Sequence, residues 1–150
     1  MRIEIVTIGN EVLSGRTFDT NFVYLARALE EASVGVAFHS TIGDSAEGIG
    51  DALKLALSRA DGVIMTGGLG PTPDDLTREA IAAVMGVALV HDDGVAAVIT
   101  NMFASRGRYM AANNLRQALV PVGATIIPQT RGTAPGLICP VSVGGVDKVV

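Results

Sequence analysis

The chain has 150 residues, of which 49% are hydrophobic and 4% aromatic, so it is long enough for one domain with a core of Ala, Val, Ile and Leu. Eleven basic against fifteen acidic residues give a net charge of −4, and no basic run offers the positive surface of a nucleic-acid-binding protein. The first residues are too short and too charged a run for a signal peptide, and no stretch reaches membrane-spanning length, so we expect a cytoplasmic protein that does not enter a membrane.

Strand and helix patterns alternate through the amino-terminal half of the chain. The predicted elements are a strand over 2–8, a polar loop over 9–21, a helix over about 20–33, a strand over 34–42, a helix with apolar positions from 49 to 60, a strand over 62–66 and a helix over about 75–85. Asp44 and Glu47 have the spacing of a cap for the second helix. Gly86 is a suitable end for the third helix.

Shorter elements follow in the carboxyl-terminal half. They are a strand over 87–90, a helix capped by Asp92 or Asp93, a short helix near 110–119, and strands near 125–127, 136–139 and 146–150. The chain ends on Asp147-Lys148-Val149-Val150, inside a strand pattern, which suggests one domain over 1–150 that is truncated at its carboxyl end.

Alternating strands and helices predict an α/β fold with a mainly parallel sheet and helices on both faces. In such sheets ligands bind beyond the carboxyl ends of the strands. The loops 9–21, 43–45 and 66–75 all leave strands at that edge, so we expect them to converge on one site.

The segment from Val63 to Arg78 is the strongest candidate for that site. Gly67, Gly68 and Gly70 allow a sharp turn with exposed N–H groups, and the next helix would point its positive end at the same place. No Lys-Ser/Thr pair follows the glycines, which excludes a P-loop, and Pro73 replaces the third small residue of a dinucleotide fingerprint. We therefore interpret the turn as an anion site of another type, and a purely structural turn is the alternative. Arg78 could either pair with a phosphate or form a surface ion pair.

Carboxylates and hydroxyls surround this turn. Thr66 and Thr72 can donate hydrogen bonds, and Asp74 and Asp75 lie where one can cap the helix while the other faces the site. Carboxylates suit Mg²⁺, which could bridge phosphate oxygens. Asp44 can equally be a cap or a site residue.

Other polar residues are weaker candidates. Glu11, Ser14, Asp19 and Asn21 of the first loop could orient a ribose, a pterin or a metal-bound water, and 132–136 is either a turn between strands or a second loop of backbone donors. His39 and His91 lack partners at metal-ligand spacing and are interpreted as structural. Cys139 is interpreted as a buried, inert thiol.

Four segments in this order resemble one protein family. They are Gly9-Asn10-Glu11-Val12-Leu13-Ser14-Gly15-Arg16 with Asp19-Thr20-Asn21, the run from Thr66 to Arg78, Asn114-x-x-Gln117-Ala118, and Gly132-Thr133-Ala134-Pro135-Gly136. Together they resemble the amino-terminal domain of the competence/damage-inducible protein A (CinA) family, within the molybdopterin-binding superfamily of MogA- and MoaB-type proteins. The run Pro71-Thr72-Pro73-Asp74-Asp75 resembles CinA rather than a MogA-type enzyme.

The resemblance implies a three-layer α/β/α sandwich, homo-oligomers such as dimers or trimers, and a site for a nucleotide or a pterin at the strand ends. Two aspartates serve adenylyl transfer to molybdopterin in MogA-type relatives, and motif matching places them on Asp44 and Asp75. In the CinA group the domain is associated with metal-dependent cleavage of ADP-ribose to AMP and ribose 5-phosphate. Gln129 departs from the family, which usually has Asn there, and the amidase domain of many CinA proteins is absent from this chain.

Our first hypothesis is therefore a pyrophosphatase that uses Mg²⁺, Mn²⁺ or Co²⁺ and acts on ADP-ribose or a related nucleotide. The predicted catalytic residues are Asp44 and Asp75, and the predicted metal ligands are Asp44, Asp74 and Asp75. The predicted substrate-binding residues are Thr66, Gly67, Gly68, Gly70, Thr72, Glu11, Ser14, Asp19, Asn21, Gly132 and Thr133. Two alternatives stay open, a molybdopterin-binding adenylyltransferase domain and a non-enzymatic oligomerising fragment.

Overall fold

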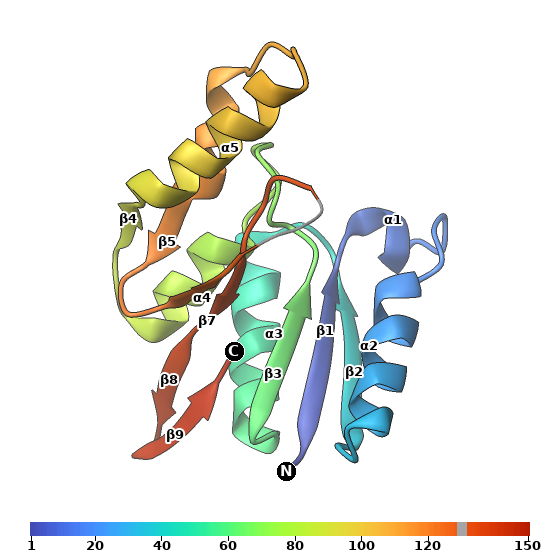
Figure 1. Ribbon diagram of the computed structural model, residues 1–150. Coiled ribbons are helices and arrows are strands. Elements are labelled where there is room, and N and C mark those ends of the chain that lie inside the picture. Colours follow the sequence, from blue (N-terminus) through green and yellow to red (C-terminus); the bar gives the residue numbers. More distant parts are fainter. Residues whose placement is uncertain (129–131) are drawn as a thin grey trace.

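The computed structural model describes residues 1–128 and 132–150 as a central sheet with helices on both faces and a smaller lobe beyond one edge (Figure 1). The helices are α1 (Asn10–Leu13), α2 (Thr20–Glu31), α3 (Ala46–Arg59), α4 (Thr77–Met85), α5 (Asp93–Ser105) and the 3₁₀ helix η1 (Ala112–Ala118). The strands are β1 (Ile3–Ile8), β2 (Val36–Ile42), β3 (Gly62–Thr66), β4 (Leu89–His91), β5 (Leu119–Pro121), β6 (Thr125–Ile127), β7 (Gly136–Ile138), β8 (Pro140–Val143) and β9 (Val146–Val149).

The main sheet has the strand order β2-β1-β3-β9-β8. β1 pairs in parallel with β2 and β3, β3 pairs in parallel with β9, and only β8 runs antiparallel. β1 is buried along its whole length because it lies between two neighbours and two helical layers. The predicted mainly parallel α/β architecture is confirmed. The carboxyl ends of β1, β2 and β3 consequently lie side by side.

Two helical layers cover the sheet. α3 and α4 pack on one face, where Val6 and Ile8 of β1 join the largest cluster of buried apolar side chains, which includes Leu53 and Ile81. α2 lies on the other face and buries no residue completely (Figure 1). The sheet is thus firmly supported from the α3 and α4 side, and α4, which begins just after the predicted glycine-rich site, joins that core through Ala80 and Ile81.

A second, smaller lobe consists of α5, η1 and the antiparallel pair β4 and β5 (Figure 1). Its own core forms around Val95, Ile99 and Ala118. Asp92 caps α5 by accepting a hydrogen bond from the amide of Val95 at 2.8 Å. The lobe projects beyond the carboxyl ends of the sheet strands, next to the glycine turn formed by residues 67–72 (Figure 1).

Several local predictions were wrong in detail. The first loop contains a short helix, α1, and the strands β5 and β8 were not predicted. Ser45, not Asp44, caps α3 by accepting a hydrogen bond from the amide of Gly48. Among the described residues, no helix is long and apolar enough to cross a membrane.

Candidate functional site

Hydrogen bonds tie the three predicted loops together at the carboxyl edge of the sheet. The amide of Asn10 donates to Asp44 Oδ2 at 3.0 Å, and the amide of Asp44 donates back to Asn10 Oδ1 at 3.3 Å. On the other side, Asn21 Nδ2 donates to Thr66 Oγ1 at 2.9 Å. The loop after β1 therefore holds both the loop after β2 and the glycine turn after β3. The predicted convergence is confirmed, and Asn10 takes part in it although it was not among the predicted site residues.

The glycine turn requires glycine at its first two positions. Gly67 and Gly68 have φ angles of 99° and 63°, which side-chain-bearing residues rarely adopt. A Cβ atom on Gly67 would lie 2.0 Å from the carbonyl oxygen of Ile8, because the turn passes directly over the end of β1. The turn is thus pressed against the carboxyl end of β1, at the centre of the converging loops.

Four consecutive carbonyl groups of this turn accept hydrogen bonds from the start of α4. Thr77 Oγ1 donates to the Gly67 carbonyl at 2.8 Å, and the amide of Thr77 donates to the Gly68 carbonyl at 3.2 Å. Arg78 then donates through Nη1 to the Leu69 carbonyl and through Nη2 to the Gly70 carbonyl at 2.9 Å. Two adjacent residues at the start of a helix therefore fix the orientation of the whole turn.

This arrangement leaves amide groups on the opposite edge of the turn. In a trans peptide the N–H points away from the C=O, and no described peptide bond is cis. With the carbonyls of Gly67 and Gly68 directed toward α4, the amides of Gly68 and Leu69 are directed away from it. Neither amide donates to any acceptor among the described residues. Two fixed N–H donors without a protein acceptor are what an anion-binding turn needs.

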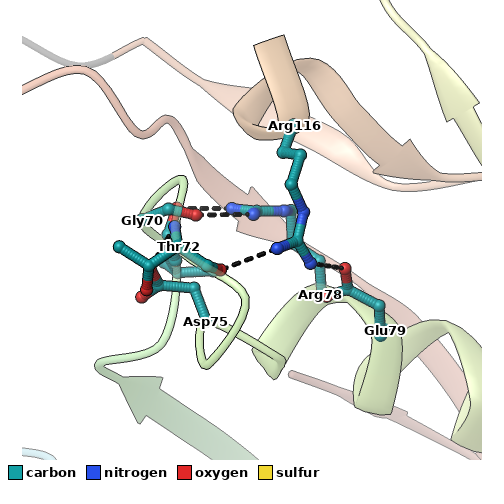
Figure 2. A network of polar contacts seen from close by, with 7 residues as sticks. Gly70, Thr72, Asp75, Arg78, Glu79 and Arg116 are labelled. Carbon is teal, nitrogen blue, oxygen red and sulfur yellow. Dashed lines mark hydrogen bonds and ion pairs between the residues drawn. The ribbon is translucent and has the colours of Figure 1, made fainter. Parts of the chain in front are cut away.

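Arg78 is almost completely buried, with 1% of its surface exposed. Burial lowers the pKa of its guanidinium, whereas the nearby Glu79 and Asp75 carboxylates favour the charged form. The sequence left open a phosphate contact or a surface ion pair for Arg78, and both interpretations were wrong. The residue instead braces the turn from inside the protein (Figure 2).

Asp75 binds the turn itself. Its Oδ2 accepts from the Thr72 amide at 2.8 Å and from the Thr72 hydroxyl at 2.6 Å. Burial would raise the pKa of the Asp75 carboxyl, but hydrogen bonds from Thr72 and from the Gly70 amide outweigh it and hold the pKa below its usual value. The prediction that Asp74 or Asp75 caps the next helix was wrong, because α4 begins after Leu76 without a side-chain cap.

Arg116 connects the turn to the second lobe (Figure 2). It lies on η1, donates through Nη1 to the Thr72 carbonyl at 2.7 Å, and forms an ion pair with Glu79 of α4 at 2.9 Å. The neighbouring Gln117 is buried and accepts a hydrogen bond from Thr133 Oγ1 at 2.8 Å. One short helix thus supports both the glycine turn and the predicted turn at Gly132 and Thr133.

Asp19 anchors the other wall of the site. Its Oδ1 caps α2 by accepting from the amide of Phe22 at 2.8 Å, and its Oδ2 lies 3.2 Å from His39 Nε2. The His39 ring stacks on Phe22 with 3.8 Å between the ring centroids. Burial would raise the pKa of the Asp19 carboxyl, but hydrogen bonds from Thr7 and Phe22 and the nearby His39 lower it. The contacts of His39 agree with its structural interpretation.

The remaining predicted residues lie in two hollows and on the surface between them. A hollow of about 140 Å³ lies between the first loop and the glycine turn, and Glu11, Asp19, Asn21, Thr66 and Gly67 are among its lining residues. Another hollow of about 180 Å³ lies at the carboxyl end of α5 and is lined by Met102, Phe103, Arg106, Arg108 and Thr133. Ser14 is exposed and donates to the Glu11 carbonyl at 3.3 Å. Gly132 lies in the turn between β6 and β7, and Asp74 is exposed. Gln129 lies outside the described residues.

The predicted metal ligands do not form a ready-made cage. Across residues 1–128 and 132–150, no three His, Cys, Asp or Glu side chains gather in a way that could hold a metal ion. Asp44 and Asp75 already accept hydrogen bonds from backbone amides. Any divalent ion would therefore need further oxygen ligands from water and from a phosphate-bearing ligand, which is how Mg²⁺ is commonly bound.

Comparisons with known proteins place this geometry in a family. The family of probable molybdopterin binding domains matches residues 4–146. The chain is 47% identical over its whole length to a putative competence-damage inducible protein of Symbiobacterium thermophilum, of which it covers 34%. It thus spans about a third of the length of the curated relatives it matches.

Solved structures agree with the sequence comparison. The structure of CinA from Thermoplasma acidophilum, a protein described as having unknown function, matches with a TM-score of 0.84 and 35% identity, over 99% of this chain and 85% of that one. The molybdopterin biosynthesis enzyme MoaB of Thermus thermophilus matches with a TM-score of 0.56 and 24% identity, over 91% of this chain and 78% of that one. The second match shows the shared fold alone, and the predicted MogA/MoaB-like fold is confirmed.

Proposed function

The chain belongs to the probable molybdopterin binding domain family, as a domain of the CinA type, and we propose that it is a divalent-metal-dependent pyrophosphatase acting on ADP-ribose or a related nucleotide. In this reaction the oxygen of one water molecule forms a bond to a phosphorus atom of the diphosphate, the P–O bond between that phosphorus and the bridging oxygen breaks, and the water gives up a proton. The products from ADP-ribose are AMP and ribose 5-phosphate. The proposal concerns this domain alone, because the chain spans about a third of the length of its curated relatives.

The observation that carries the proposal is the pair of free amides on the glycine turn. Gly68 and Leu69 present N–H groups without an acceptor among the described residues, while Thr77 and Arg78 hold their carbonyl neighbours in place. Donors that are fixed before the ligand arrives stabilise developing negative charge without a reorganisation cost. A diphosphate is a suitable ligand because it offers several anionic oxygens to such donors.

The carboxylates fit a metal ion that arrives with the phosphate. Asp44 lies at the edge of the site and Asp74 is exposed, so both are accessible to an ion whose other ligands are water and phosphate oxygens. A bound divalent ion would supply positive charge to the diphosphate in a protein whose net charge is −4. Asp75 is a less accessible ligand because its Oδ2 already accepts two hydrogen bonds from Thr72.

The other residues of the site would position the ends of the ligand. Asn21 fixes the hydroxyl of Thr66 beside the hollow of about 140 Å³, which is well placed for one end of the substrate. Arg106 and Arg108 line the hollow that contains Thr133, and neither forms an ion pair with a described residue. These two guanidinium groups could donate further hydrogen bonds to anionic oxygens of the diphosphate, which joins the two ends of the ligand.

One assay tests the proposal directly. The purified protein is incubated with ADP-ribose and Mg²⁺, Mn²⁺ or Co²⁺, and AMP is measured by chromatography. We expect AMP release that depends on the metal and that falls at least 100-fold in Asp44→Asn, on the scale of losing one electrostatic contribution to the transition state. Asp51→Asn is the matched control, since Asp51 is 69% exposed on α3 and pairs only with Lys54 among the described residues. Absence of AMP with every metal, in a protein whose circular dichroism shows it to be folded, would contradict the proposal.

A second function is favoured by the family itself. The matching family is one of probable molybdopterin binding domains, and the fold is shared with MoaB. The same free amides could bind the phosphate of molybdopterin, with adenylyl transfer as the reaction. Molybdopterin binding without turnover of ADP-ribose would favour this function, and failure to bind either ligand would favour a non-enzymatic oligomerising domain.

A further inference from the structure

Phe18 is an apolar side chain in an unusual place. Its surface is 93% exposed, more than that of any other large hydrophobic residue described. It is also the one aromatic side chain among the described residues that line the hollow between the first loop and the glycine turn. The other residues around this hollow are largely polar and include Asn21 and Thr66. The fold thus places an exposed phenyl ring among polar groups at the edge of the candidate site.

The backbone around Phe18 is firmly held. The amide of Thr17 donates to the Glu11 carbonyl at 3.0 Å, and the amide of Thr20 donates to the Phe18 carbonyl at 2.9 Å. Asp19, the next residue, caps α2 and contacts His39. The exposure of Phe18 therefore does not come from a loose loop. The fold presents the ring to solvent at a fixed point.

The size of the hollow indicates what it can hold. At about 140 Å³ it is smaller than the roughly 300–1,000 Å³ of sites that enclose a whole small molecule. It suits one group at the end of a larger ligand whose diphosphate lies on the glycine turn, since Gly67 and Thr66 line both places. Polar atoms from Asn21 and Thr66 lie where they could bond the edge of that group, and Phe18 offers a face for stacking.

We propose that Phe18 stacks on the planar heterocycle of the ligand, which is either adenine or a pterin. Both are flat, polar-edged ring systems, and an aromatic side chain binds such rings through their faces while hydrogen bonds recognise their edges. The inference rests on the proposed function in so far as it assumes a nucleotide or pterin ligand. Beyond the proposed function, it assigns recognition of the ring to Phe18 and places the ring end of the substrate beside the first loop.

Binding measurements separate the ring from the phosphate. Titration calorimetry with Mg²⁺ compares AMP, which carries adenine, with ribose 5-phosphate, which carries no ring, and with neopterin, which carries a pterin. We expect Phe18→Ala to weaken AMP binding about tenfold or more, in line with the loss of one stacked base. Phe18→Trp should bind AMP at least as tightly as the wild type. Binding of ribose 5-phosphate should change less than about twofold in both variants.

Tyr24→Ala is the matched control. Tyr24 is also an exposed aromatic residue, 73% accessible on the adjoining helix α2, but it does not line the hollow. Neither substitution removes a buried group, so both variants should fold, and urea unfolding checks this. If Tyr24→Ala weakens AMP binding as much as Phe18→Ala, the stacking assignment is wrong.

Three further outcomes would overturn the inference. The first is that Phe18→Ala binds AMP and neopterin within twofold of the wild type. The second is that it loses ribose 5-phosphate and AMP binding equally. The third is that it loses self-association on size-exclusion chromatography, which would make Phe18 a contact between copies. Dependence of neopterin rather than AMP binding on Phe18 would support stacking and assign the ring as a pterin. A wild type that binds AMP through Phe18 but releases no AMP from ADP-ribose would contradict the proposed function and leave the inference standing.

Discussion

Replacement of Arg78 by Met tests whether the glycine turn depends on the guanidinium that braces it. Arg78 is buried, and it supplies the donors for the carbonyls of Leu69 and Gly70. Met has a similar length and can occupy most of the same buried volume, but it cannot donate a hydrogen bond. The substitution therefore removes two hydrogen bonds from a charged donor while keeping most of the packing.

The expected loss of stability follows from two opposing contributions. Two hydrogen bonds to a charged donor contribute about 1.5–3 kcal/mol each. Removing the buried guanidinium also offsets part of this loss of stability, because burying its charge is unfavourable, as the lowered pKa of Arg78 indicates. We expect a net loss of about 2–4 kcal/mol in the free energy of unfolding. For a chain of 150 residues, a loss of about 3 kcal/mol lowers the melting temperature by roughly 6–12 °C.

Urea unfolding measures the global loss, and hydrogen exchange of the amides of 67–72 measures the local one. We expect faster exchange in the turn of Arg78→Met and an intermediate loss of stability in Arg78→Lys, because one ammonium group cannot reach both carbonyls as a planar guanidinium does. Arg27→Met is the matched control, since Arg27 is exposed on α2, and its free energy of unfolding should change by less than about 0.5 kcal/mol. An unchanged urea midpoint together with unchanged exchange in Arg78→Met would refute the bracing role.

Three further predictions concern single residues. Gly67→Ala should lower the free energy of unfolding by more than about 3 kcal/mol in urea, because it combines a positive φ with a Cβ 2.0 Å from a carbonyl oxygen. Gly15→Ala is the control: its φ is 75° but nothing lies within 4 Å of the new Cβ, so the loss should be only about 1 kcal/mol. The Asp75 pKa is lower in the folded than in the unfolded protein, so the stability that this carboxylate contributes is present above about pH 4 and is lost as the pH falls through the folded pKa. Asp75→Asn should therefore lose less stability than the wild type on acidification below about pH 4. An identical acid titration of the two proteins would contradict this. Burial raises the pKa of the Cys139 thiol to about 11, so a thiol reagent at about pH 8 should label Cys139 only after unfolding, and rapid labelling of the folded protein would show that the thiol is accessible.

The arrangement of the main elements could be predicted because it depends on local patterns. Alternating strands and helices predict a parallel sheet, and a parallel sheet brings the loops after successive strands to one edge. The pairs Asn10–Asp44 and Asn21–Thr66 are the direct result of that rule. The strands β5 and β8 could not be predicted in the same way, because β5 follows η1 without a break and β8 begins with proline, which is depleted in strands.

The roles of individual polar residues could be predicted only in part. Asp44, Asp75 and Arg78 were each selected, but a carboxylate or guanidinium can serve as a cap, a brace or a ligand, and the sequence does not choose among these. In the structure Ser45 caps α3, and Asp75 accepts hydrogen bonds from Thr72 within the glycine turn. Arg116 was missed altogether, because its partner Thr72 lies 44 positions away and no local pattern connects them.

The bracing residues give a physical basis for the proposal that the glycine turn is an anion site. A glycine-rich turn has two polar edges, one of carbonyls and one of amides, and a free turn could present either of them to solvent. Thr77 and Arg78 bind the carbonyls of 67–70, and Arg116 binds that of Thr72, so the carbonyl edge is held inward by three side chains. The amides of Gly68 and Leu69 are then the groups that remain for a ligand. Under the proposed function, Arg78 and Arg116 would therefore favour anion binding by selecting which edge of the backbone faces the site.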